Sequence, residues 1–367
     1  MTTGQGPAPD GIDGERAPEA MKAEEPDFRN VVLSHARKSL NPKDLGALQD
    51  LLASEQGAML AEVLMQRRCL TDLLELNRRK NQWLLNYRRD VTSQSGEDGV
   101  IEKILELIPN QTEWCVEFGA LNGELYSNTY NLIMNRGWSS IQIEGEPAYH
   151  KRLQQTHAGR ENVHCLNQYV GLEAGSTLDE ILAKFPIPKD FDLLSIDIDG
   201  CDYHVWRSLK NYRPKIIVIE FNPAIPPHIT FVQAPDFRLR EGSSLRAMWE
   251  LGKELGYTLV CNTFANAIFV RTDYAAPFGV ETDDPEPFFR SRELLLDLFQ
   301  LFDGTLVVEG NRTLNWSKVP FGSRDLQVMP SLCRGPYWTR FPFIRKKWLQ
   351  LFHPNRVRNR KRASKDY

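Results

Sequence analysis

Short apolar runs alternate with longer helical segments between about residues 114 and 222, and this alternation restricts the fold more than any other feature of the sequence. Five runs read as strands: WCVEFGA (114–120), SIQIEGE (140–146), VHCLNQYV (163–170), FDLLSIDIDG (191–200) and KIIVIEFN (215–222). Helices are expected at about 127–136, 147–157, 176–185 and 202–210, the third with Ser176 as its N-cap. Such alternation over short connections predicts a parallel sheet covered by helices on both faces.

The alternation ends after the fifth strand. A Pro-rich loop leads to a helix in SSLRAMWELGKELG, and YTLVCNT and NAIFVRTD then read as two strands joined by a tight connection. The sequence therefore predicts an α/β, Rossmann-like, doubly wound sheet of five parallel strands with a terminal antiparallel hairpin. A dinucleotide-binding domain differs, because its sheet ends in parallel strands.

The flanking regions differ in composition from this core. Residues 1–30, rich in Pro, Gly, Ala and Glu, are predicted to be disordered. Residues 31–90 carry leucines at helical spacing and predict a helical arm, which packs on the main domain or forms a homo-oligomer with its copy. The α/β domain is placed at 91–275 and a C-terminal extension at 276–367. A helix is expected there in PFFRSRELLLDLFQLF, followed by a basic tail that either contacts an acidic surface or is simply solvated.

The overall composition limits the location and the partners of the protein. The net charge is -3 over 367 residues, which gives no strong nucleic-acid signal. The six cysteines are scattered without metal-ligand spacing, and no apolar run approaches the roughly 20 residues of a membrane span. We predict a cytoplasmic protein that is at most membrane-peripheral.

Acidic and small residues follow the first two strands. Glu117 and Gly119 end the first strand, and Asn122 and Gly123 continue the turn, where the backbone can approach a ligand closely. The dinucleotide pattern G-x-G-x-x-G is absent, and an acid before the glycine suits a cationic ligand such as S-adenosylmethionine. Glu144 ends the second strand, 144 − 123 = 21 positions after Gly123, near the spacing expected for a carboxylate that binds ribose hydroxyls. A plain tight turn and a solvated acid at the sheet rim are the alternatives.

Two amides could complete a ligand site. Asn167 follows the third strand and could read the edge of an adenine, although a turn residue explains it equally well. Gln94, in SQSGEDG, precedes the first helix of the domain, and this segment could fold over a cofactor. A helix cap by Ser95 is the competing explanation.

Three acids follow the fourth strand in LLSIDIDGCDYHVW: Asp197, Asp199 and Asp202. A phosphatase of the haloacid-dehalogenase type is disfavoured, because its Asp-x-Asp follows the first strand of the sheet. A glycosyltransferase that holds a metal with Asp197 and Asp199 stays open as an alternative, although it leaves Glu117 and Glu144 unexplained. A non-catalytic cofactor-binding protein of the same fold also stays open.

The motifs together resemble a known family. SQSGEDGVIEKIL, VEFGALNGELYSNT, IEGEP, LLSIDIDGCDYHVW and IIVIEFN are similar to the FkbM-type S-adenosylmethionine-dependent methyltransferases, a class I methyltransferase family. The resemblance covers about residues 92–273 and departs from the family in the first turn, where Asn122 lies two positions beyond Ala120. It implies S-adenosylmethionine as cofactor and methylation of a hydroxyl on a sugar, glycan precursor or secondary metabolite.

Residue roles follow from this resemblance. The implied cofactor-binding residues are Gln94, Glu117, Gly119, Asn122, Gly123, Glu144, Asn167 and Asp197. Asp199 and Asp202 would face the acceptor, and His204 is a candidate base because its unperturbed pKa is near neutrality; an ordinary polar helix residue is the alternative. Oxygens of Asp199, Glu220 and Asn222 could hold Mg²⁺, which would acidify the acceptor hydroxyl.

Overall fold

The computed structural model describes residues 80–330 and the single positions 50, 334, 343, 347 and 351. The chain divides into two compact units, residues 1–74 and 75–367. Only Asp50 of the first unit is described. The expected disorder at 1–30, most of the helical arm at 31–90 and nearly all of the basic tail lie outside the described residues, so self-association through the arm stays a prediction.

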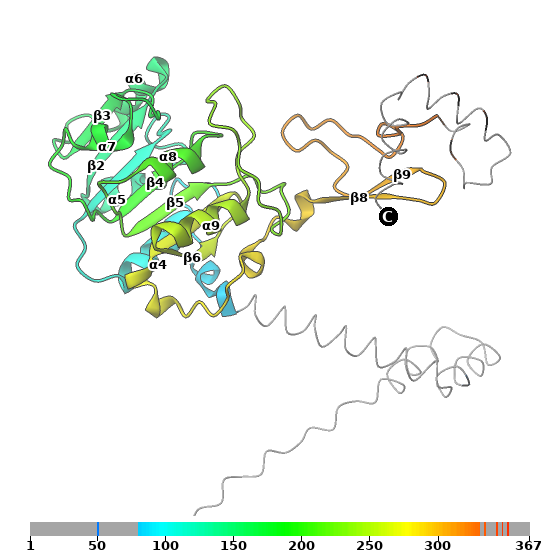
Figure 1. The fold of residues 1–367 in the computed structure, drawn as a ribbon. Coiled ribbons are helices and arrows are strands. Elements are labelled where there is room, and N and C mark those ends of the chain that lie inside the picture. Colours follow the sequence, from blue (N-terminus) through cyan, green and yellow to red (C-terminus); the bar gives the residue numbers. More distant parts are fainter. Residues whose placement is uncertain are drawn as a thin grey trace, which may run out of the picture. The chain divides into compact units, whose positions relative to one another are not determined.

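The second unit contains a seven-stranded sheet whose order is β3-β2-β1-β4-β5-β7-β6 (Figure 1). Its strands are β1 (Trp114–Phe118), β2 (Ser139–Glu144), β3 (Val163–Asn167), β4 (Leu193–Ile196), β5 (Ile216–Glu220), β6 (Tyr257–Asn262) and β7 (Asn266–Arg271). The first five strands are parallel, and β7 is antiparallel to both β5 and β6. The predicted fold class, a doubly wound sheet with a terminal antiparallel hairpin, is confirmed.

Helices cover both faces of this sheet. They are α4 (Glu97–Leu107), α5 (Tyr130–Arg136), α6 (Pro147–Thr156), α7 (Leu178–Leu182), α8 (Asp202–Ser208) and α9 (Leu245–Leu255), with short 3-10 turns at η1 (Trp83–Tyr87), η2 (Thr272–Tyr274) and η3 (Ala276–Phe278). Alternate strand residues enter two separate cores: Val116 packs with α7, α8 and α9, whereas Cys115 packs with α4 and α5. The strands are therefore buried on both sides, as their apolar runs predict.

Two local predictions are wrong. Thr177, not Ser176, is the N-cap of α7, because its hydroxyl accepts a hydrogen bond from the Glu180 amide and the Glu180 side chain completes a capping box. The helix expected at 287–302 is replaced by two 3-10 turns and a strand. These are η4 (Glu286–Phe288), η5 (Arg292–Leu294) and β8 (Leu296–Gln300), which pairs with β9 (Leu306–Gly310). Phe288 and Phe289 are both buried in a core of the large sheet, and this anchoring, together with the β8–β9 pairing, overrides the helical pattern.

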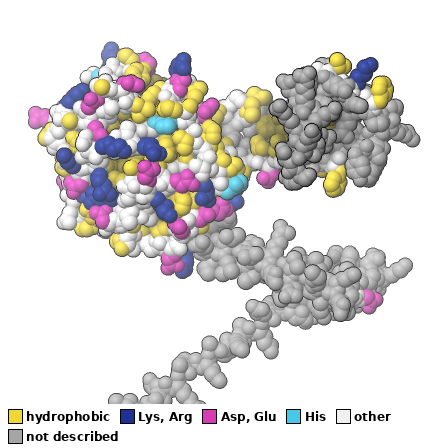
Figure 2. Space-filling model, in the orientation of Figure 1, with side chains coloured by type: hydrophobic (Ala, Val, Ile, Leu, Met, Phe, Trp, Pro, Cys, Tyr) yellow, Lys and Arg dark blue, Asp and Glu magenta, His cyan; other side chains and the backbone are white. Residues whose placement is uncertain are grey.

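The surface of the second unit carries both signs of charge. On the face drawn in Figure 2, Lys and Arg side chains are interspersed with Asp and Glu rather than gathered into one patch. Among the described residues, no helix combines the length and the apolar character needed to cross a membrane.

Candidate functional site

The chain reverses its direction of travel through the sheet at β1, which lies between β2 and β4. In open α/β sheets, ligands bind at the carboxyl ends of the strands beside such a switch point. Gly119 follows β1 with φ +74°, and a Cβ at this position would lie 1.7 Å from the Asp197 carbonyl oxygen. Only glycine therefore allows the ends of β1 and β4 to approach this closely.

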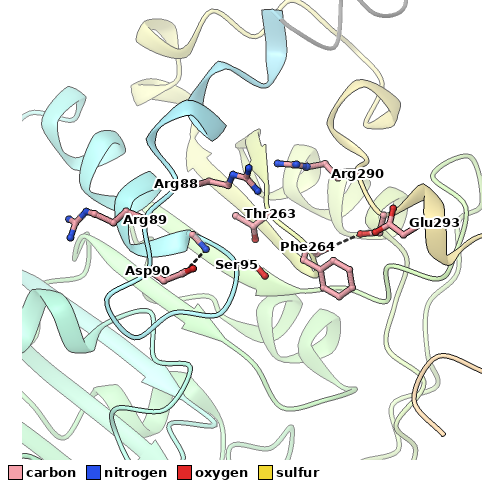
Figure 3. Close-up of a pocket in the computed structure, with 10 residues that line it drawn as sticks. Arg88, Arg89, Asp90, Ser95, Thr263, Phe264, Arg290 and Glu293 are labelled. Atoms are coloured by element: carbon pink, nitrogen blue, oxygen red, sulfur yellow. Dashed lines mark hydrogen bonds between the residues drawn. The ribbon is translucent and has the colours of Figure 1, made fainter. Parts of the chain in front are cut away.

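Residues 88–96, called here the leading segment, run across the same edge of the sheet. The Asp98 carboxylate accepts hydrogen bonds from the backbone amides of residues 91, 92 and 93 and so fixes the segment to the start of α4. In the middle of the segment, the Thr92 hydroxyl donates to the Ser127 carbonyl of the β1–α5 loop. Its two ends, residues 88–90 and 95–96, line a recess beside the β6–β7 turn (Figure 3). Gln94 is exposed within this segment, and its contact with a cofactor stays a prediction.

Glu117 lies within β1 and is buried. Its carboxylate accepts hydrogen bonds from the Ser127 hydroxyl (2.5 Å), the Asn128 amide (2.8 Å) and the Thr129 hydroxyl (2.7 Å). Burial raises the pKa of Glu117, while these hydrogen bonds oppose that rise. Glu117 thus orders the loop that follows the β1 turn, and its predicted contact with a cationic cofactor is not needed to explain an acid at this position.

Glu144 ends β2 and faces the turn that follows β1. Its carboxylate accepts hydrogen bonds from the Leu121 amide at 2.8 Å and from the Glu146 amide at 2.7 Å. The residue is 7% exposed. Its hydrogen bond to the Leu121 amide joins the ends of β1 and β2, which a cofactor would approach. Asn167 lies beside it at the end of β3, where its amide donates to the carbonyls of Glu144 and Gly145. The structure thus brings the predicted ribose and adenine residues together.

Asn122 and Gly123 shape the turn itself. The Asn122 side chain accepts hydrogen bonds from the amides of residues 124 and 125, forming an Asx turn. Gly123 has φ +80°, and a Cβ here would meet Leu153 at 2.6 Å and His157 at 2.8 Å. Both residues therefore have local roles, and contact of either with a cofactor stays a prediction.

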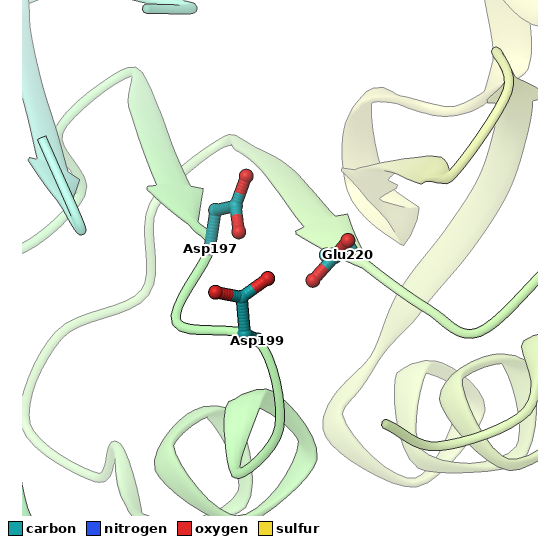
Figure 4. Close-up of side chains that lie close together, drawn as sticks. All are labelled: Asp197, Asp199 and Glu220. Carbon is teal, nitrogen blue, oxygen red and sulfur yellow. The ribbon is translucent and has the colours of Figure 1, made fainter. Parts of the chain in front are cut away.

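Three carboxylates converge where β4 and β5 end. Oxygens of Asp197, Asp199 and Glu220 lie within 4.8 Å of one another (Figure 4). The pKa of Asp197 is raised by desolvation and by the charges of Asp202 and Asp199, and that of Glu220 by desolvation and the charge of Asp197. Because Asp197 keeps much of its surface in solvent, we attribute its shift mainly to the neighbouring charges. A proton or a cation would relieve this crowding.

The donor set suits a hard divalent cation, for which carboxylate oxygens are the usual ligands. It differs from the predicted set, however. Asp199 and Glu220 are present, but the Asn222 side chain accepts from the Ala224 amide and donates to the Glu241 carbonyl, which commits it to its own loop. Asp197, rather than Asn222, supplies the third group of oxygens. The register explains this, since Ile196 pairs with Ile219 and the residues that follow them, Asp197 and Glu220, therefore lie side by side.

The other predicted catalytic residues have partners within the protein. Asp202 is buried in the first turn of α8, and its carboxylate accepts from the Ile198 amide at 2.9 Å and the Gly200 amide at 2.8 Å. This geometry favours shaping of the β4–α8 loop over contact with an acceptor. His204 Nε2 lies 2.7 Å from the Gln233 carbonyl oxygen, so Nε2 carries the proton and Nδ1 is left to accept one. Asp199 is exposed, with φ +57°, 3.5 Å from Arg240.

Comparison with solved structures finds distant likenesses to methyltransferases. A structure of TrmK from M. capricolum in complex with S-adenosyl-homocysteine is 13% identical, with a TM-score of 0.29, and the match covers 46% of this chain and 65% of that chain. A SAM-dependent methyltransferase from Aquifex aeolicus is also 13% identical, with a TM-score of 0.29 over 46% of this chain and 87% of that chain. Because these TM-scores are low, we take the fold from the strand order itself.

Comparison with known sequences gives a match to one family model and none to a curated protein. A family model described as the methyltransferase FkbM domain matches residues 173–259, the stretch that contains β4, β5 and the acids at their ends, whereas Glu117 and Glu144 lie outside it. The family resemblance expected from the motifs is thus confirmed: residues 173–259 of this chain match the methyltransferase FkbM domain.

Proposed function

We propose that this chain is an S-adenosylmethionine-dependent methyltransferase that acts on a hydroxyl of a small molecule, of the sugar, glycan-precursor or secondary-metabolite class. The observation that carries the proposal is the bond between the Leu121 amide and Glu144 (2.8 Å), which holds the β1 turn against the end of β2 at the switch point. A carboxylate in that position, at the end of the strand beside the switch point, suits ribose hydroxyls.

S-adenosylmethionine supplies a methyl group on a positively charged sulfur when it is bound. Glu144 would accept from the ribose hydroxyls, and Asn167 would lie at the adenine side. Asp197, at the end of β4, would face the ammonium of the methionine part, where a positive charge would favour its ionised form and offset the raised pKa.

The acceptor would approach from the β4–β5 side. As the methyl is transferred, the bond from sulfur to methyl carbon breaks, the bond from acceptor oxygen to that carbon forms, and the hydroxyl proton leaves to a base. Asp199 is the best placed base because it is exposed, whereas the oxygens of Asp202 already accept from two loop amides. Nδ1 of His204 is a second candidate, since Nε2 is occupied.

A divalent cation is a further part of the proposal. The oxygens of Asp197, Asp199 and Glu220 would hold it, and the cation would lower the pKa of an acceptor hydroxyl bound to it. Asp199 would then be a ligand, and Nδ1 of His204 would take the proton. Thermal unfolding of the purified protein with added Mg²⁺ or Mn²⁺ tests this part. We expect stabilisation that Asp199→Asn and Glu220→Gln remove; no stabilisation of the wild type would refute the cation without affecting the rest of the proposal.

The cofactor assignment is tested by calorimetric titration with S-adenosylhomocysteine. We expect binding by the wild type, at least roughly tenfold weaker binding by Glu144→Gln through loss of a charged hydrogen-bond acceptor, and unchanged binding by the neighbouring exposed control Glu146→Gln. Absence of wild-type binding would overturn the cofactor assignment. Equal binding by Glu144→Gln would remove Glu144 from the ribose.

The acceptor class needs a product measurement. Incubation with ¹³C-methyl-labelled S-adenosylmethionine and pooled sugars or metabolite extracts should yield a methoxy carbon in the NMR spectrum of the small-molecule fraction. A labelled methyl on carbon or nitrogen would contradict hydroxyl methylation. Cofactor binding without release of S-adenosylhomocysteine in any acceptor pool would favour a non-catalytic binding protein instead.

A further inference from the structure

The recess beside the β6–β7 turn is distinct from the acid cluster. Its volume is about 590 Å³, a size that suits part of a small molecule. Three stretches of chain that are distant in sequence line it: the two ends of the leading segment, the β6–β7 turn through Thr263 and Phe264, and the segment with Arg290, Ser291 and Glu293. The Phe264 ring is 38% exposed at its rim and offers an apolar surface.

Two arginines, Arg88 and Arg290, point toward each other across this recess (Figure 3). Within the described part of the chain, neither forms an ion pair. Arg290 Nη1 is buried and has no hydrogen-bond partner among the same residues. Burial, followed by the charge of Arg88, lowers the pKa of Arg290. The two guanidinium groups thus face each other with at least one buried donor unsatisfied, an arrangement that an anion between them would stabilise.

The acids of the recess do not supply that anion. Asp90 accepts hydrogen bonds from the Ser93 hydroxyl and the Gly96 amide, which fold the leading segment on itself. Glu293 is exposed on the rim, and although its charge opposes the lowering of the Arg290 pKa, the two side chains form no ion pair among the described residues. A third arginine, Arg89, points away from the recess in Figure 3 and pairs with Glu102.

The recess adjoins the side of the sheet from which an acceptor would approach. Glu220, of the acid cluster, pairs with Asn266, and the Phe221 amide donates to the Ala265 carbonyl at 2.9 Å. The turn that lines the recess is therefore bonded directly to the end of β5. Glu97, at the start of α4, accepts from Thr263, Asn266 and the Ser95 amide, and so fixes the leading segment to the same turn.

We propose that this recess binds an oxyanionic group of the methyl acceptor, a phosphate or a carboxylate, between Arg88 and Arg290. The Phe264 ring would cover the adjoining carbon skeleton. Guanidinium groups match the geometry of both oxyanions, since each can donate two parallel hydrogen bonds. The identification of the ligand as the acceptor rests on the proposed function, whereas the anion site itself does not.

The test uses the full-length protein and two probes, inorganic phosphate and malonate, titrated by calorimetry at constant ionic strength. We expect one probe to bind more tightly, which identifies the group, and Arg88→Gln and Arg290→Gln each to weaken that probe at least tenfold, about 1.4 kcal/mol. Arg136→Gln is the matched control. It removes the same charge from an exposed arginine at the C-terminal end of α5 and should bind as the wild type does.

Two outcomes would overturn the inference: neither probe binding the wild type, or both variants binding like the control. Arg88 is exposed, so Arg88→Gln should fold normally and still tests the site if Arg290→Gln does not fold. Titration of the same proteins with S-adenosylhomocysteine separates the two proposals, because Arg88→Gln should retain that binding. Phosphate or malonate binding without S-adenosylhomocysteine binding would refute the methyltransferase proposal and leave an anion site.

Discussion

A buried ion pair at the amino end of the sheet gives the sharpest prediction about stability. Lys215 precedes β5 and lies 2.6 Å from Asp192, which precedes β4, and their side chains are 1% and 0% exposed. The Asp192 carboxylate also accepts from the Thr112 amide (2.7 Å), the Thr112 hydroxyl (3.0 Å) and the Glu113 amide (2.7 Å), just before β1. This pair therefore joins the beginnings of three adjacent strands.

Removing either charge should be costly because the other is left buried. We expect Asp192→Asn to lower the free energy of unfolding by about 3–5 kcal/mol. The substitution leaves the buried ammonium of Lys215 without a counter-charge and replaces one accepting oxygen with a donating NH2 group. Lys215→Met should cost about 3 kcal/mol, because three hydrogen bonds still satisfy Asp192. The double variant should cost less than the sum by about 1 kcal/mol or more.

Urea unfolding followed by circular dichroism measures these free energies. The pair lies at the opposite edge of the sheet from the candidate site, so the folded fraction of each variant should bind S-adenosylhomocysteine as the wild type does. A loss below about 1 kcal/mol for Asp192→Asn, as for an exposed pair, or strict additivity in the double variant, would refute the reasoning.

Three further predictions concern His157, Gly119 and Asp202, with Gly137 as the comparison for Gly119. Burial lowers the pKa of His157 to about 4 from 6.5, so below pH 6.5 the unfolded chain binds a proton that the folded protein does not. The free energy of unfolding should therefore fall by about 2 kcal/mol from pH 7 to pH 5. If thermal unfolding of His157→Gln depends on pH as steeply as that of the wild type, this reasoning is contradicted. Gly119→Ala should cost about 2–4 kcal/mol, because its Cβ would strike the Asp197 carbonyl at positive φ. Gly137→Ala, with φ +72° and open space, should cost only about 1 kcal/mol in the same urea measurement. Asp202→Asn should cost about 1–3 kcal/mol through its two loop amides yet keep S-adenosylhomocysteine affinity, and a selective loss of affinity would instead place it at the ligand.

The sheet was predictable because its signal is local. Each buried strand reads as a continuous apolar run, and each connection between parallel strands contains a helix, so the succession of strands and helices along the chain follows from the sequence. The helix expected at 287–302 failed for the opposite reason. Its apolar residues have helical spacing, but Phe288 and Phe289 are buried against the large sheet, and Leu296–Gln300 pair with a strand that begins at Leu306. Those contacts depend on the tertiary structure.

The site was predictable as a set of strand ends, less so as a set of contacts. Glu144, Asp197 and Glu220 end or follow their strands as expected, and parallel strands bring such ends to one edge. The sequence could not show that the oxygens of Glu117 and Asp202 are satisfied by nearby loops. Short-range hydrogen bonds of this kind depend on loop geometry, which the residue types alone do not determine.

The arginine recess was not predicted, because its two arginines come together only in the tertiary structure. Arg88 and Arg290 are 290 − 88 = 202 positions apart in the sequence. Arg88 lies in the leading segment and Arg290 lies beyond the hairpin, so neither follows a parallel strand, where ligand-binding residues are expected. Their proximity places a positive surface beside the negative carboxylates at the carboxyl edge of the sheet. An anionic acceptor would be repelled by Asp197, Asp199 and Glu220. A separate cationic recess, bonded to the end of β5 through the β6–β7 turn, would hold the anionic end away from those carboxylates while a hydroxyl at the other end reaches them. Positive and negative surfaces at neighbouring points of one edge would then orient an acceptor, and reversing the charge at Arg88 should impair acceptor binding rather than cofactor binding.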